Sequence, residues 1–284
     1  RLSIDLTGVE ELRLNDDLEE LLLLGDMSDN CQILVKDHGA SLRLQLDRSL
    51  PKVLGLKDLG AIHCSNILEI DFAQILNNYP NLRELRLWGK PGHILNFHKL
   101  SELKELINFS TVDLFGFTAE DIPKPEDLPQ LSMFWMSSLP EEAAKVAKKY
   151  YKKQQDKGLN LWITKPRKAE WLAQNLDNPF RSWDGQENIS TANAKKAASL
   201  YRKTRASVIK LLENPNEDTM KHIEALIREY TQGFNKMDKR NCFIETIERE
   251  DIYSALVEIL DLLPEDLGMD KEKFIEIFDE LKDF

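Results

Sequence analysis

The sequence is poor in cysteine, glycine, proline and long apolar runs, and each shortage excludes a class of protein. Its three cysteines are far apart and form no CxxC pair, which excludes a disulfide framework and a zinc knuckle and favours a reducing, cytoplasmic location. Twelve glycines and eleven prolines are too few for a collagen-like or wholly disordered chain. The apolar tract Leu21–Leu24 is far shorter than the roughly 18 to 20 residues that span a bilayer, so no membrane span is expected. No basic and apolar leader follows Arg1, so no targeting segment is expected.

Charge is abundant and unevenly distributed. The 284 residues are 42% hydrophobic and 31% charged, which is typical of one large or two ordinary globular domains. The net charge is −11, yet residues 141–210 hold 16 basic and 7 acidic side chains between two acidic flanks. An acidic chain with a basic middle argues against wrapping nucleic acid and suits either charge matching within the chain or a protein partner that is itself basic. Composition indicates no cofactor and leaves the oligomeric state open.

Four segments align as copies of an L-x-x-L-x-L pattern. The clearest copy is Pro80–Trp88, and the others are Ser49–Lys57, Ile107–Phe115 and Pro129–Ser137. Their central apolar positions, 54, 85, 112 and 134, are 31, 27 and 22 residues apart, and a fifth copy is expected at 161. Helix-like stretches lie between copies, and strands that alternate with helices pair in parallel.

With these copies, above all Ile75–Leu87, the chain resembles the leucine-rich-repeat superfamily over about residues 50–164. The resemblance implies a curved parallel sheet with helices outside it and, most often, a role in binding protein. It implies no chemistry. The copies lack the Asn or Cys that usually follows the strand and are unevenly spaced, so a short, irregular solenoid is expected. The alternative is that the leucines belong to an ordinary doubly wound α/β fold.

We therefore predict an α/β fold in three parts. An N-terminal cap at 1–49 precedes the leucine-rich-repeat-like solenoid at 50–164, and an α-helical C-terminal domain follows at 165–284. The cap is predicted to contain a β-hairpin, because Gln32–Lys36 and Ser41–Leu46 have strand patterns around a short glycine turn.

Helix signals appear in the second half of the chain. Ser138 and Glu141 have capping-box spacing, which predicts a helix from Ser138 to Gly158, and a last strand is predicted at Leu159–Ile163. Beyond Pro166 the apolar residues recur at helical spacing, which predicts four or five helices. Their predicted buried stripes are Ala194, Ala198, Tyr201, Val208 and Leu212; Met220, Ile223, Ile227, Tyr230 and Phe234; Ile252, Ala255, Ile259 and Leu263; and Phe274, Ile277, Phe278 and Leu281.

Catalytic motifs are absent from the sequence, which contains no G-x-S-x-G, P-loop, G-x-G-x-x-G or H-E-x-x-H. The carboxylates of Glu245, Glu248, Glu250 and Asp251 are close enough in sequence to suggest a divalent cation site. The favoured interpretation is structural, because Thr246 is a good N-cap and acidic residues in the first turn stabilise the helix dipole. No metal site is predicted.

A basic run follows the predicted helix start. Its lysines alternate with two tyrosines, a composition that also occurs in RNA-binding segments. Helical spacing favours a simpler interpretation, in which the lysines form the solvent face of a helix whose other face carries Val146 and Tyr150. The lysines are Lys145, Lys148, Lys149, Lys152, Lys153 and Lys157.

Stacking the predicted strands in register brings several aromatic residues onto one surface. Because side chains alternate across a strand, Leu85 pointing inward places its neighbours on the concave side. Trp and Arg are the residue types most enriched at binding hot spots. The alternative is that the C-terminal helices bury these rings. The predicted partner-binding residues are Glu84, Arg86, Trp88, Asp113, Phe115, Trp135 and Trp162.

Two functions fit these patterns. The first is a non-catalytic protein–protein recognition module, such as an inhibitor, a neutralising protein or an adaptor, that grips a partner through its aromatic concave face. The second is an enzyme or nucleic-acid-binding protein with its site in the C-terminal helices, around Arg181, Trp183, Asp184, Glu245 and Glu248. The aromatic set and the lack of catalytic motifs favour the first, and nucleic acid is not the expected partner.

Overall fold

The computed structural model describes residues 1–25, 31–51, 53–239, 242–264 and 271–284. The chain divides into two compact units, Arg1–Leu172 and Ala173–Phe284, and each is described here by itself. The division falls shortly after the predicted domain start at 165, because the last strand of the first unit continues to Arg167. Lys52, inside the first predicted repeat copy, lies outside the described residues.

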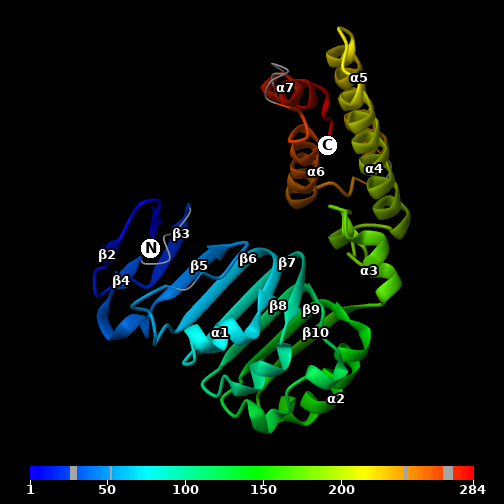
Figure 1. Ribbon diagram of the computed structural model, residues 1–284. Helices are drawn as coiled ribbons and strands as arrows, with labels where there is room; N and C mark the ends of the chain where they lie inside the picture. Colours follow the sequence, from blue (N-terminus) through cyan, green and yellow to red (C-terminus); the bar gives the residue numbers. More distant parts are fainter. Residues whose placement is uncertain (26–30, 52, 240–241, 265–270) are drawn as a thin grey trace. The chain divides into compact units, whose positions relative to one another are not determined.

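The first unit is built on an eight-stranded sheet, so the protein is a mixed α/β protein with a largely parallel sheet (Figure 1). Every neighbouring pair of these strands runs parallel over the described residues. The strands lie along an arc in Figure 1. In sheet order they are β1 (Leu2–Asp5), β3 (Glu20–Leu24), β5 (Arg43–Asp47), β6 (Ala61–Asp71), β7 (Glu84–Leu95), β8 (Asn108–Phe115), β9 (Met133–Pro140) and β10 (Asn160–Arg167).

The predicted N-terminal hairpin is wrong. β4 (Gln32–Leu34) pairs in parallel with β2 (Glu11–Arg13) in a separate two-stranded sheet, whereas β5 pairs with β3 and β6. The two predicted hairpin strands are separated by the 3-10 helix η1 (Lys36–Gly39). Leu44 lies opposite Ile62 in the buried row of the main sheet, and this burial determines where β5 pairs. The main sheet thus includes the region predicted to be a cap.

Three of the five predicted repeat centres are confirmed by the register, since Leu85, Phe134 and Leu161 occupy equivalent positions of β7, β9 and β10. The centre at Leu54 is wrong, because Leu54 makes an isolated bridge with Gln32 and the strand beside β7 is β6. Val112 lies on β8, the parallel neighbour of β7, as predicted. The predicted alignment of Val112 with Leu85 is wrong by three residues, because Phe109 lies opposite Leu85. Phe109 is fully buried, and its ring fills the core where Val112 was expected.

The chain bends at one level of the sheet, within β6, β8, β9 and β10 and directly after β5. The bend residues have a left-handed backbone conformation that is uncommon for residues with a side chain, and β7, between β6 and β8, contains none of them. Their φ values lie between 48° and 67°, at Arg48, Asn66, Asp113, Ser138 and Lys165. This row corrects the predicted helix start at Ser138, which belongs to β9. The helix α2 (Glu141–Gln155) begins three residues later, after Pro140.

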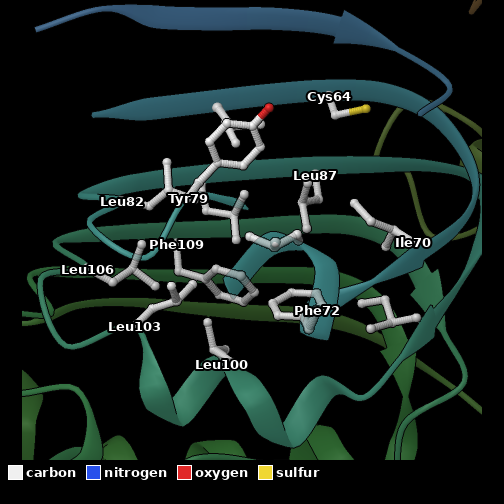
Figure 2. Packing of buried hydrophobic residues seen from close by; sticks show 14 of the residues in the cluster. Cys64, Ile70, Phe72, Tyr79, Leu82, Leu87, Leu100, Leu103, Leu106 and Phe109 are labelled. Atoms are coloured by element: carbon white, nitrogen blue, oxygen red, sulfur yellow. The ribbon is translucent and has the colours of Figure 1, made fainter. Parts of the chain in front are cut away.

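Helices and 3-10 turns cover one face of the sheet. They connect successive strands and comprise α1 (Phe72–Asn78), η2 (Phe97–Glu102), η3 (Ala119–Asp121), η4 (Pro125–Asp127) and α2. Figure 2 shows Phe72 of α1, Phe109 of β8 and Leu100 of η2 gathered between the sheet and these connections. The core of the first unit therefore lies on this side of the strands.

The second unit is helical, and its predicted stripes are confirmed. It contains η5 (Arg181–Trp183), α4 (Thr191–Glu213), α5 (Thr219–Asp238), α6 (Thr246–Leu260) and α7 (Lys271–Leu281), while α3 (Ala169–Asn175) leads into it. The predicted α5 stripe is buried from Ile223 to Phe234, and Met220 is partly buried. Trp183 packs inside this core beside Phe180 and Phe234.

Candidate functional site

The sheet face opposite α1 and α2 carries the exposed tryptophans of the first unit. On β7, Leu85 and Leu87 are fully buried, while Trp88 points to the other face and is 40% exposed. The same alternation exposes 37% of Trp135 on β9 and 52% of Trp162 on β10. We call this surface, with Glu84 and Arg86 of β7, the aromatic face.

The two last tryptophans of the aromatic face form a pair. Trp135 lies opposite Trp162 in register, and the ring centroids are 5.8 Å apart at an interplanar angle of 66°. The indole Nε1–H of Trp135 donates a hydrogen bond of 3.1 Å to the Oδ1 of Asn160. This bond orients the Trp135 ring against the sheet and leaves part of the indole exposed.

Two predicted members of the site do not lie on the aromatic face. Asp113 is 9% exposed and Phe115 is 5% exposed, because Asp113 is the bend residue of β8 and Phe115 lies beyond the bend. Their prediction depended on aligning Val112 with Leu85. In the true register β8 contributes the smaller side chains of Asn108, Ser110 and Val112, opposite Glu84, Arg86 and Trp88.

A charged cluster lies beside the tryptophans. Oε1 of Glu84 is 3.0 Å from Nη2 of Arg43 and 3.0 Å from Nε of Arg86. The side chain of Glu84 is mostly buried, whereas those of Arg43 and Arg86 are 42% and 40% exposed. Asn108 donates from Nδ2 to the other carboxylate oxygen at 3.3 Å. One carboxylate is therefore shared by two guanidinium groups.

His63 lies opposite Arg86 in register and contacts Trp88. Its ring meets the indole of Trp88 edge to face, with the centroids 4.2 Å apart. Burial lowers the pKa of His63 below its ordinary value of 6.5, and the positive charges of Arg86 and Arg43 lower it further. Its Nε2 is buried and accepts or donates no hydrogen bond among the described residues. A neutral imidazole therefore lies beside both Arg86 and the indole of Trp88.

Sequence analysis missed Arg43 and His63 as members of the site. Arg43 was assigned to a hairpin, and the strand that carries His63 was predicted seven or more residues too early. The available signal was the alternating pattern of Ala61–Cys64, in which Ile62 and Cys64 are buried and His63 is not. That pattern is too short to be distinguished from a loop without its neighbouring strands.

The alternative site in the second unit consists of groups with structural roles. Trp183 is buried and donates from Nε1 to Oδ2 of Asp251 at 2.8 Å, while burial raises the pKa of Asp251. Oε2 of Glu248 accepts the backbone N–H of Glu245 at 3.0 Å, so Glu245 rather than Thr246 is the N-cap of α6. Within the described ranges, three or more His, Cys, Asp or Glu side chains nowhere form a group suited to a metal ion. Arg181 and Asp184 are partly exposed.

The lysines of α2 face solvent, as their spacing predicts. Lys145 pairs with Glu141 at 3.1 Å and with Glu142 at 2.8 Å. Val146 and Tyr150 are partly buried against the core, as predicted, and Tyr151 is fully buried. The Tyr151 hydroxyl donates to the carbonyl of Pro123.

Fold and surface together define an α/β protein with a parallel sheet, one face of which carries exposed indoles beside shared charges. Comparison with protein-family models, curated proteins and solved structures finds no match to this chain. No helix in the part of the chain that the structure describes is long and apolar enough to cross a bilayer.

Proposed function

We propose that this chain is a non-catalytic recognition module that binds a protein partner through the aromatic face of a leucine-rich-repeat-like sheet. The observation that carries the proposal is the exposure of Trp88, Trp135 and Trp162 on one face of one sheet. Large apolar side chains gathered on a surface mark interaction sites more often than scattered ones do. Arg86, partly exposed beside them, adds the other residue type common at hot spots.

The role that suits such a module is that of an inhibitor, a neutralising protein or an adaptor, because none of these needs a catalytic group. The net charge of −11 favours a partner that is basic overall, since the long-range field of the chain steers such a partner toward it. A cytoplasmic location is supported by the three free cysteines, of which Cys31 and Cys64 are buried.

Affinity capture from the native source, followed by titration of the captured partner, tests the proposal. The double variant Trp135→Ala/Trp162→Ala is compared with Leu68→Ala, which removes a 64% exposed apolar residue of β6 beyond the bend. We expect the double variant to lose roughly thirtyfold or more in affinity, as truncation of central interface aromatics does, and the control to bind normally. Equal binding by both variants would contradict the proposal.

A further inference from the structure

The cluster on β5 and β7 has more cationic groups than it neutralises. Arg43 and Arg86 each approach the same oxygen of Glu84, and no second carboxylate of the described residues lies within ion-pair distance of either. His63 adds no negative charge. Two positive charges and one negative charge therefore leave a surplus of one positive charge within the cluster of Arg43, Glu84 and Arg86. Glu20, opposite Arg43 in register, pairs instead with Arg1.

The guanidinium groups also have donors to spare. A guanidinium carries five N–H donors in a planar fork, and the contacts with Glu84 engage Nη2 of Arg43 and Nε of Arg86. Both side chains remain about two-fifths exposed, although the Nε of each is buried. The remaining forks match a second carboxylate, which would accept charge-assisted hydrogen bonds from both arginines.

We infer that the partner places an acidic side chain, flanked by apolar or aromatic residues, against Arg43 and Arg86 and beside the indole of Trp88. This inference rests on the proposed function and specifies the chemistry of the contact. The apolar flanks follow from the neighbours of the cluster, since Trp88 and Val112 are exposed on the next level of the same face. Indole surface around the ion pair excludes water and strengthens it.

A protein carboxylate suits this surface better than a nucleic-acid backbone. Glu20, Glu84 and Asp47 lie on the same face and repel a polyanion, whereas a single carboxylate needs only the one surplus charge. Nucleic-acid binding requires several neutralised phosphates. A partner that is basic overall can still contribute this acidic side chain. Its total charge determines how it is steered toward the acidic chain, whereas the contact with Arg43 and Arg86 depends on a single residue.

Blocked tripeptides test the inference directly on the full chain. The probes are tryptophan–aspartate–tryptophan and tryptophan–asparagine–tryptophan, each acetylated and amidated, which differ in one charge and have the same shape. We expect the aspartate peptide to bind roughly tenfold more tightly and to shift the NMR signals of the Arg86 Nε–H and the Trp88 indole N–H. Equal affinity of the two peptides would overturn the inference.

Two variants locate the effect. Arg86→Gln should reduce the affinity for the aspartate peptide roughly fivefold, whereas Arg13→Gln, at an exposed arginine of β2, should leave it unchanged. Glu84→Gln removes the carboxylate that occupies both guanidinium groups, so we expect it to tighten binding roughly threefold. This gain keeps the inference testable if Arg86→Gln does not fold. Weaker binding by folded Glu84→Gln would overturn it.

Other sources of negative charge give distinguishable outcomes. One control is the asparagine tripeptide with a free C-terminus: if it binds more tightly than the blocked aspartate peptide, the ligand is a terminal carboxylate and not an acidic side chain. The second control is inorganic phosphate: if it displaces the aspartate peptide at equal concentration, the site binds anions in general, which contradicts an acidic side chain as the ligand. If tripeptide discrimination fails while Trp135→Ala/Trp162→Ala still abolishes partner binding, the inference fails and the proposed function stands.

Discussion

Trp135 and Trp162 lie directly opposite each other on the two last strands of the sheet, and their rings meet edge to face with centroids 5.8 Å apart. Such a contact contributes about 0.5–1.5 kcal/mol beyond the area it buries. Trp135 remains 37% exposed and Trp162 52% exposed, so folding leaves a substantial part of their apolar surface in contact with solvent.

Replacing a partly exposed tryptophan should lower the free energy of unfolding less than replacing a buried one. We expect Trp135→Ala to lower the free energy of unfolding by about 1–2 kcal/mol, because it removes one ring contact, one hydrogen bond and the partial burial of the ring. Trp183→Ala should cost about 3–5 kcal/mol in the helical unit, since Trp183 is fully buried. Urea unfolding of both variants measures the difference. A large loss with Trp135→Ala would mean that this ring belongs to a core.

Acid should destabilise the first unit through His63. Its folded pKa is lowered by burial and by Arg86 and Arg43, against the smaller opposing effects of Glu84 and Glu20. Below pH 6.5 the unfolded chain binds a proton at His63 that the folded chain does not, so the free energy of unfolding falls as the pH decreases. His63→Gln should flatten this part of the pH dependence in urea titrations. His222→Gln, at an exposed histidine of the other unit, should leave it unchanged.

Tyr79 holds the segment before β6. Its hydroxyl donates to the carbonyl of Pro51 at 2.8 Å and accepts the N–H of Val53 at 3.2 Å. Tyr79→Phe leaves both backbone groups without these partners, and we expect a loss of about 1–3 kcal/mol in unfolding free energy. Tyr253→Phe, at a tyrosine that is 39% exposed, should change it by less than about 0.5 kcal/mol. Equal losses would show that the buried hydroxyl is unimportant.

Alanine substitutions at two glycines distinguish the cost of a left-handed backbone from the cost of steric overlap. Gly8 and Gly55 both have left-handed φ values, 74° and 92°. A Cβ at Gly55 would overlap the carbonyl oxygen of Ile33, whereas a Cβ at Gly8 would meet open space. Gly8→Ala should therefore cost about 1 kcal/mol, and Gly55→Ala distinctly more. Thermal melts of the two variants provide the comparison, and a smaller effect at Gly55 would contradict it.

Chelation should not affect folding. The carboxylates of Glu245 and Glu248 take part in the capping box of α6, and Asp251 accepts a hydrogen bond from Trp183. We expect melting temperatures with and without EDTA to coincide. A marked decrease on chelation would show that these carboxylates, or others, bind a metal ion that contributes to the fold.

Much of the local structure could be predicted from periodicity. The stripe from Ile223 to Phe234 in α5 is long enough for its 3.6-residue period to be unambiguous, and it is buried. Trp88, Trp135 and Trp162 were placed on one face for a similar reason, because each adjoins a buried residue of the opposite parity on its strand. Caps were less reliable: Ser138 has the spacing of an N-cap, yet it bends a strand.

The sequence by itself determined the strand and helix periods, the helical second half and the side of each strand that carries a tryptophan, because these depend on neighbours within a few residues. Only the tertiary structure decided register and pairing. Phe109, not Val112, fills the core beside Leu85, and this three-residue shift moves Asp113 and Phe115 off the aromatic face. The meeting of Arg43, His63 and Arg86 likewise depends on parallel pairing of β5, β6 and β7. Such contacts arise between residues some twenty positions apart or more, where the packing of whole side chains decides between registers that local patterns leave equivalent.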